Sequence, residues 1–198
     1  MSDRSDSPPV EVVPYDEDWP RHAAAELTAL TTALGDLVLH AAHIGSTSIP
    51  MMAAKDIIDL QLSVWDLDEA AAAFDVPLAG LGYVRLPYER DHVPAGDGSD
   101  PGLWAKRYWR RRGHPDGDVN LHVRVVGSPN ERLALLFCDY LRAHPLAVAA
   151  YGRFKQELAA QVGDLEIYTD IKDPVVDVVI VAAEDWASAT DWQPHGGS

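Results

Sequence analysis

One stretch of the chain, residues 43–62, limits the folds that this sequence can adopt. It contains the pair Gly45-Ser46 after an apolar run, and Asp59 follows Ser46 by thirteen residues, inside the apolar segment 57–64. A strand that ends at Gly45-Ser46 lets the backbone approach a phosphate, because glycine has no side chain and the following turn offers N–H groups. Segment 57–64 has the nearly continuous apolar content of a central strand, which would present Asp59 to a divalent cation. The stretch therefore predicts a phosphate-binding turn beside a carboxylate.

Such a pair of strands is the outline of a nucleotidyltransferase active site, in which a metal ion bridges the phosphates of a nucleotide. The outline normally carries a second carboxylate two positions after the first, but Gln61 stands there and supplies at most one neutral oxygen. A regular strand would place Asp56 on the opposite face from Asp59, and a position at the entrance of the strand is the alternative. A third ligand is expected from a later strand, where His122 is favoured over Asn120. We expect Asp59 and His122 to form a metal site that is weak for Mg²⁺, which prefers oxygen ligands.

The chain also resembles a known protein family along most of its length. The likeness is carried by HIGSTSIP with AAKDIID, WAKRYWRRRG, VNLHVRVVGSPNERLALLFCDYLRAHP, AYGRFKQELA and the spaced Tyr168, Lys172 and Trp186. On these residues the chain resembles the GrpB family, a nucleotidyltransferase-like group that also forms the C-terminal domain of actinobacterial dephospho-CoA kinases. The resemblance implies an α+β fold with a small mixed sheet flanked by helices and a C-terminal helical bundle. Together with the outline above, it implies Mg²⁺ as cofactor and a nucleoside triphosphate as donor.

Several polar residues of the first stretch are candidates for contact with a phosphate or for catalysis. Ser46 and Thr47 are expected to bind phosphate through hydroxyl and backbone groups, although both can also cap a helix. His43 is expected either to orient a phosphate or act as general base, or simply to bond a backbone carbonyl. Lys55 is placed to approach a phosphate, and an exposed turn lysine is the alternative. For His122 the alternative is a hydrogen-bonded histidine on a half-buried strand face.

Helices later in the chain offer a second set of candidates. They are Asp139, Arg142, Lys155, Tyr168 and Lys172. Asp139 and Arg142 are three residues apart on one predicted helix, so pairing with each other is the simpler interpretation. Members of the family usually carry arginine where this chain has Cys138, so the resemblance does not carry over any anion contact that this arginine makes.

The charge of the chain limits its partners. A net charge of −15, from 31 acidic and 16 basic residues, argues against binding to nucleic acid or to an anionic membrane. The exception is segment 106–112, which holds five of the basic residues. Alternation along this predicted strand places Arg107 and Trp109 on one face of the sheet and Tyr108 and Arg110 on the other. We expect Arg107 to face a small anionic or nucleotide ligand, and a solvated charged strand is the alternative.

Periodicity and cap signals divide the chain into helices and strands. Helices are predicted over residues 18–34, 47–54, 66–80, 128–143, 146–162 and from 173, and strands over 37–44, 57–64, 83–86, 103–111 and 119–126. Two helix starts rest on specific signals, the capping box Ser128–Glu131 and the Asp173-Pro174 pair. Loop 88–102 is long and polar, and an ordered loop of that length is expected to be functional.

One domain over residues 10–187 is expected, with a disordered tail at 1–9 and a flexible tail at 188–198. The single Cys138 excludes an internal disulfide, and the absence of a charged and then apolar leader predicts a cytoplasmic protein. No apolar run is long enough to span a bilayer. The sequence contains no P-loop motif, so kinase activity is not expected.

Two classes of function are compatible with these patterns. The first is a transferase of nucleotidyltransferase type that moves a nucleotidyl or phosphoryl group to a small acceptor with a divalent metal. The second is a catalytically degenerate module of the same fold that binds a nucleotide, a small anionic metabolite or a partner protein without turnover. Gln61 favours the second class, and Gly45-Ser46 with Asp59 favours the first. We expect the first class, a transferase of nucleotidyltransferase type, and the second is the alternative.

Overall fold

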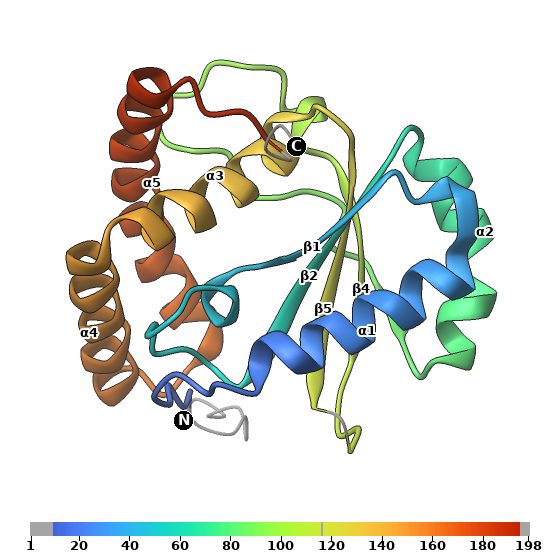
Figure 1. Ribbon diagram of the computed structural model, residues 1–198, viewed down its shortest axis with the longest axis horizontal. Helices are drawn as coiled ribbons and strands as arrows, with labels where there is room; N and C mark the ends of the chain where they lie inside the picture. Colours follow the sequence, from blue (N-terminus) through green and yellow to red (C-terminus); the bar gives the residue numbers. More distant parts are fainter. Residues whose placement is uncertain (1–9, 116, 195–198) are drawn as a thin grey trace, which may run out of the picture.

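The computed structural model describes residues 10–115 and 117–194 and contains a five-stranded sheet with helices on both faces (Figure 1). The elements are α1 (Trp19–Leu34), β1 (His40–Ile44), β2 (Ile57–Val64), α2 (Leu67–Gly80), β3 (Val84–Leu86), β4 (Lys106–Arg111), β5 (Asp118–Val125), α3 (Pro129–Ala143), α4 (Pro145–Gln161) and α5 (Leu165–Thr190). The predicted fold class, a small mixed sheet flanked by helices with a helical group at the C-terminal end, is confirmed.

The strand order is β1-β2-β5-β4-β3, and β2 and β5 run parallel while the other neighbours are antiparallel. The register of the parallel pair sets Asp59 opposite Asn120, and it sets Gln61 opposite His122. Because strand side chains alternate between faces, these four residues point to the same side of the sheet. The parallel pairing therefore gathers the polar residues of two distant segments.

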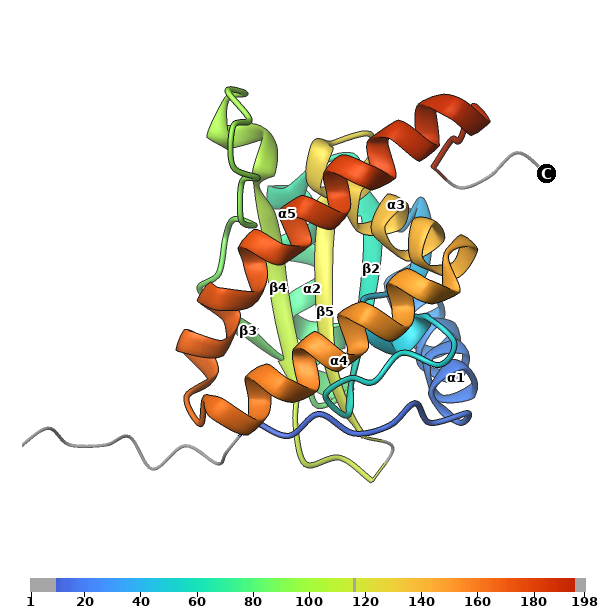
Figure 2. The ribbon, with the colours of Figure 1, turned by 90° about the vertical axis from the view of Figure 1, so that its left-hand side faces the viewer.

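The two faces of the sheet are covered by different groups of helices. Helices α1 and α2 pack on one face, where Leu60 and Leu121 are fully buried against Trp19 and Phe74 in the largest apolar core. Helices α3, α4 and α5 lie over the other face (Figure 2). Two smaller apolar clusters join these helices to the turn after β1 and to each other. The polar face of β2 and β5 thus lies beneath the C-terminal helices.

Helix α5 begins earlier than the sequence predicted. Asp164 accepts hydrogen bonds from the N–H groups of Glu166 and Ile167 and is the N-cap, whereas Pro174 lies inside the helix. Proline removes one hydrogen bond to the preceding turn, but Pro174 and Asp170 are both exposed, so water can solvate the carbonyl that is left. The prediction that Asp173-Pro174 starts the helix is therefore wrong.

The capping box predicted at the start of α3 does not form. Helix α3 begins at Pro129 as expected, but Ser128 makes no side-chain cap. The Glu131 carboxylate instead accepts a hydrogen bond of 2.6 Å from Ser63 Oγ and one of 3.1 Å from the Gly127 N–H. Glu131 is buried, so its carboxylate links helix α3 to strand β2 across the interior.

Other differences concern short segments. Residues 47–54 form only a 3₁₀ turn at Ser46–Ser48, followed by a bridge between Ala54 and Val13. Residues 188–194, predicted as tail, continue α5 to Thr190 and place Trp192 where its Nε1 donates to Asp139 Oδ2 at 3.0 Å. The predicted tail 1–9 and residues 195–198 lie outside the described residues.

Within the described part of the chain, no single helix is long and apolar enough to cross a membrane. The consecutive helices α3 and α4 meet that length and composition test only together, across a bend of 112°.

Candidate functional site

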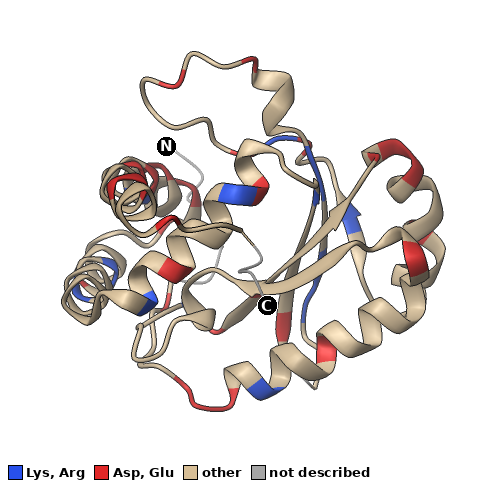
Figure 3. Ribbon diagram, turned by 45° about the horizontal axis from the view of Figure 1, so that its top comes forward, with Lys and Arg blue, Asp and Glu red and all other residues tan. Residues whose placement is uncertain are grey.

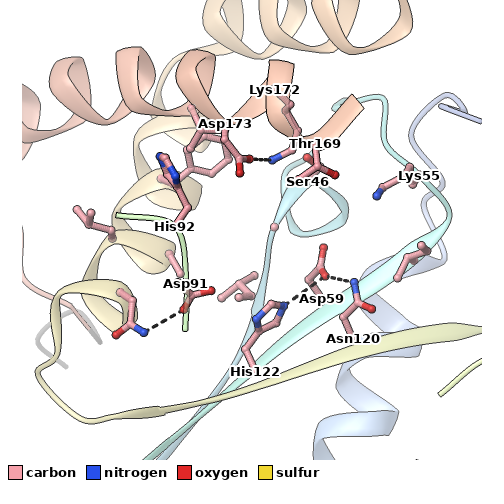
Figure 4. A pocket seen from close by; sticks show the side chains of 18 of the residues that line it. Ser46, Lys55, Asp59, Asp91, His92, Asn120, His122, Thr169, Lys172 and Asp173 are labelled. Atoms are coloured by element: carbon pink, nitrogen blue, oxygen red, sulfur yellow. Dashed lines mark hydrogen bonds and ion pairs between the residues drawn. The ribbon is translucent and has the colours of Figure 1, made fainter. Parts of the chain in front are cut away.

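A cavity of about 590 Å³ lies between the polar face of the sheet and helices α3 to α5. Its volume is within the range of small-molecule sites. Figure 4 shows Asp59, Asn120 and His122 on its floor, with Ser46 and Lys55 across from them and Lys172 and Asp173 entering from α5. The structure therefore brings together residues that are more than a hundred positions apart in the sequence.

Gly45 and Asp59 touch at the edge of this cavity. Gly45 has φ +69° and ψ −171°, a backbone conformation that side chains rarely allow. A Cβ atom at this position would lie 2.7 Å from Asp59 Oδ2, so only glycine fits beside the carboxylate. The carboxylate of Asp59 is thus the immediate neighbour of Gly45, and the approach of Gly45 to a phosphate stays a prediction.

Asp59 is held by two residues of β5. The Asn120 amide donates a hydrogen bond of 2.7 Å to Asp59 Oδ1, and His122 Nε2 lies 3.7 Å from the same oxygen. Burial acts to raise the pKa of Asp59, but the contacts of His122 and Asn120 outweigh it and hold that pKa below its usual value. Burial lowers the pKa of His122 to about 4, so this histidine is neutral at pH 7 while Asp59 is ionised.

The 3₁₀ turn Ser46–Ser48 forms a second wall of the cavity. His43 Nε2 lies 2.9 Å from Thr47 Oγ1, and burial lowers the pKa of His43 to about 4, so His43 is neutral at pH 7. From α4, Lys155 Nζ donates a hydrogen bond of 2.7 Å to Ser46 Oγ. The predicted residues His43, Ser46 and Thr47 thus form one connected group, and Lys155 extends it.

Three lysines surround the turn. Lys55 Nζ lies 5.7 Å from the centre of the Tyr168 ring, and Lys172 Nζ pairs with Asp173 at 2.8 Å. Lys155 is buried, with its Nζ 4.9 Å from the centre of the Tyr151 ring. Burial, with the nearby charge of Lys172, lowers the pKa of Lys155 to about 7. The cavity therefore holds one ammonium group that is close to losing its proton at neutral pH.

Strand β4 presents its arginines differently from the prediction. The alternation is as expected, but Trp109 is buried against Phe74 beneath α2, which turns Arg107 to that same face. Arg107 pairs with exposed Asp68 and does not line the cavity, so the choice of Arg107 was wrong. Arg110 lines the cavity instead, and its Nε is buried without a hydrogen-bond partner in the described structure.

Loop 88–102 contributes a carboxylate that the sequence did not single out. Asp91 accepts hydrogen bonds of 2.7 Å from Lys106 Nζ and 2.8 Å from Arg124 Nε, and a third comes from Asn130. Burial opposes its ionisation, but Arg124 and Lys106 hold the pKa of Asp91 well below its usual range. Arg124 could have been found, because it alternates with Asn120 and His122 on one strand face, whereas no local pattern marks Asp91.

The donor atoms present do not fit a resident Mg²⁺ ion. The Gln61 oxygen accepts from Arg124 Nη1, and the Asn120 oxygen accepts from Tyr108 Oη at 2.6 Å and from Arg112 Nη2 at 2.7 Å. Asp59 is then the only carboxylate on the cavity floor formed by β2 and β5. Among residues 10–115 and 117–194, no group of three His, Cys, Asp or Glu side chains could hold a metal ion.

The charges that line the cavity favour an anion. Six cationic side chains face four carboxylates, whereas the whole chain carries −15. Figure 3 shows the basic segment along β4 within a chain whose other charged positions are mostly acidic. The lining cations are Lys55, Arg110, Arg112, Arg124, Lys155 and Lys172, and the carboxylates are Asp59, Asp91, Asp173 and Asp177.

Comparisons with known proteins cover nearly the whole chain. A family model described as GrpB protein matches residues 9–181. A dephospho-CoA kinase of Mycolicibacterium paratuberculosis is 37% identical over 94% of this chain and 49% of that protein. The UPF0157 protein YqkA of Bacillus subtilis is 34% identical over 89% of this chain and 48% of that protein. The chain thus spans about half the length of these relatives. The crystal structure of conserved protein GrpB from Enterococcus faecalis matches with a TM-score of 0.72 and 27% identity, over 89% of this chain and 99% of that one.

Proposed function

The chain belongs to the GrpB family, as its sequence motifs predicted, and on this premise we propose that its cavity binds a small phosphorylated ligand of nucleotide type. The phosphate would lie at the turn Ser46–Ser48, within reach of Lys155 and Lys55. The apolar part of the cavity wall, which includes Leu133, Phe137, Val176 and Ile180, would accommodate a base or another flat group.

The observation that carries this proposal is the environment of Lys155. Its side chain is 97% buried, since only 3% of the residue is exposed, and within the described residues it forms no ion pair. A buried ammonium group without an opposite charge is costly, which is why the pKa of Lys155 is lowered, and an anionic ligand beside it would stabilise the charged form. The unbonded Nε of Arg110 in the same cavity supports the same conclusion. A phosphate has the charge and the acceptor oxygens to satisfy both groups.

Thermal unfolding tests the proposal directly. The panel contains nucleoside triphosphates, nucleoside monophosphates, coenzyme A precursors and inorganic phosphate, with the precursors included because one relative is named dephospho-CoA kinase. A ligand at a hundred times its Kd adds about 2.7 kcal/mol, which raises the Tm of a chain of this size by roughly 5–10 °C. An unchanged Tm with every phosphorylated compound would refute the proposal.

Two variants on helix α4 separate the cavity from the surface. Lys155→Met removes the buried ammonium group and keeps a similar volume, so the fold should stand, because an unpaired buried charge is itself costly. Arg153→Met is the matched control, since Arg153 is exposed on the same helix and lies 3.7 Å from Glu157. We expect Lys155→Met to abolish the ligand-dependent rise in Tm and Arg153→Met to preserve it.

A second candidate function is transfer of a nucleotidyl or phosphoryl group to a small acceptor. The observation that favours it is Asp59, an ionised carboxylate set against Gly45 beside the phosphate turn. Because the donor atoms do not fit a resident Mg²⁺ ion, no step of such a reaction is assigned to the metal. Chelator-sensitive release from a nucleoside triphosphate of pyrophosphate, which accompanies nucleotidyl transfer, or of the nucleoside diphosphate, which accompanies phosphoryl transfer, would support transfer if it is lost in Asp59→Asn. Binding without any release would leave the binding role alone.

A further inference from the structure

The position two residues after Asp59 is occupied by an amide that serves an internal contact. The Gln61 side chain is 99% buried; its oxygen accepts a hydrogen bond from Arg124 Nη1, and its nitrogen donates to the Glu131 carbonyl at 3.3 Å. Neither end of this amide is free to reach a ligand in the cavity. A positively charged side chain therefore contacts the position at which the nucleotidyltransferase outline has a second metal-binding carboxylate.

Arg124 is fixed in this place from several directions. Its residue is only 5% exposed, its Nε donates to Asp91 Oδ2 at 2.8 Å, and its Nη2 lies 3.4 Å from His122 Nδ1. The same His122 ring lies 3.7 Å from Asp59 through its other nitrogen. The guanidinium is thus separated from the Asp59 carboxylate by a single imidazole ring.

Arg124 shares its counter-charge with a second buried cation. Asp91 is the carboxylate that contacts both Arg124 and Lys106, so two cations share one anion. Both cations are buried, and water screens buried charges less than exposed ones. A metal dication brought to Asp59 would be repelled by these two buried cations, whereas an anion would be attracted by them.

We infer that Arg124 supplies, as a fixed guanidinium, the positive charge that a divalent cation would supply beside Asp59. The cavity then binds its anionic ligand in the metal-free form. The inference rests on the proposed function for the identity of the ligand. It adds that the protein itself contributes the cation and that it excludes divalent metal from the site.

Metal binding by four forms of the protein tests the exclusion without any ligand. Mn²⁺ binding is measured by electron paramagnetic resonance for the wild type, Gln61→Glu, Gln61→Glu/Arg124→Gln, and that double variant with Asp59→Asn. In Gln61→Glu the new carboxylate should pair with Arg124, so Mn²⁺ should bind no better than to the wild type. In the double variant Arg124 is gone while Asp91 keeps Lys106, so Asp59 and the new carboxylate should bind Mn²⁺ at least about tenfold more tightly than the wild type does, which is 1.4 kcal/mol. Asp59→Asn should remove this gain.

Either of two results would overturn the inference. One is tight Mn²⁺ binding by the wild type or by Gln61→Glu, and the other is no gain in a double variant whose circular dichroism shows it to be folded. If the double variant does not fold, the wild-type arm and the ligand arm below still decide the matter.

The ligand arm uses the wild-type protein, with ATP as the probe in isothermal titration. We expect binding with EDTA to be at least as tight as binding with excess Mg²⁺, because the free phosphates carry more negative charge. An affinity that rises about tenfold on addition of Mg²⁺, which is 1.4 kcal/mol, would contradict the inference. An absence of binding by any phosphorylated compound under both conditions would refute the proposed function, and the Mn²⁺ measurements would still stand by themselves.

Discussion

Replacing Gly45 by alanine should destabilise the protein through the contact between two strands, and Gly35 provides the matched control. Gly45 has φ +69° and ψ −171°, and Gly35 has φ +65° and ψ −148°, so a side chain meets similar backbone strain at both. That strain amounts to about 1–3 kcal/mol at each site. The surroundings differ, because a Cβ at Gly35 meets nothing within 4 Å, whereas a Cβ at Gly45 lies 2.7 Å from Asp59 Oδ2 and 3.0 Å from Asp59 Cβ.

The clash at Gly45 should add a further penalty of about 1–3 kcal/mol, as is typical of overpacking in a close-packed region. The Asp59 Cβ cannot swing away as the end of a flexible side chain could, so strand β2 must shift. We therefore expect the free energy of unfolding from urea titration to fall more for Gly45→Ala than for Gly35→Ala by that difference. Equal losses in the two variants would show that the contact with Asp59 does not constrain the turn and would refute the reasoning.

Three further predictions concern titration and strain. Burial lowers the pKa values of His43 and His122 from 6.5 to about 4, so between these pH values the unfolded chain binds more protons than the folded chain. Stability that is present above pH 6.5 should therefore be lost as the pH falls towards 4, by about 3 kcal/mol for each histidine. Urea titrations that gave equal free energies of unfolding at pH 7 and pH 5 would contradict this. Because the pKa of Lys155 is lowered to about 7, the affinity for a phosphorylated ligand should fall as the pH rises from 7 to 9, by up to about tenfold per pH unit. Isothermal titration should show no such pH dependence of the affinity in Lys155→Met. An affinity of the wild type that does not change with pH would argue against contact between Lys155 and the phosphate. Met51 is exposed and has φ +65°, a left-handed conformation that costs a residue other than glycine roughly 1–2 kcal/mol. Met51→Gly should therefore stabilise the protein by up to about 1 kcal/mol, once the larger loss of backbone entropy of glycine on folding is subtracted. A lower Tm in the variant would count against strain at Met51.

The sheet could be predicted because its signals are local. Apolar content, alternation and length indicated all five strands, although those predicted from residues 37 and 103 begin only at His40 and Lys106, after 3₁₀ turns. The cap at Asp66 is formed as expected, with its carboxylate accepting from the N–H groups of Asp68 and Glu69. The failures came from signals that have more than one use. Glu131 has the spacing of a capping box but is drawn into the interior by Ser63, and Asp173-Pro174 resembles a helix start but lies within an exposed part of α5.

The candidate site was predictable only in part, for a physical reason that β4 illustrates. Alternation shows which residues of a strand share a face, but it does not show which face meets the cavity. That choice depends on where the large apolar residue packs, and Trp109 packs beneath α2. Residues whose role depends on contacts far along the chain, such as Asp91 with Arg124, 33 positions apart, are visible only once the fold brings them together.

The anchoring of Asp91 changes how loop 88–102 is to be regarded by anyone who redesigns this domain. A polar loop of this kind ordinarily tolerates shortening, because its removal costs little beyond a new closure. Here its deletion would leave two buried cations, Lys106 and Arg124, without the carboxylate that they share. A shortened loop would need neutral residues at both positions, so loop 88–102 and strands β4 and β5 must be redesigned together.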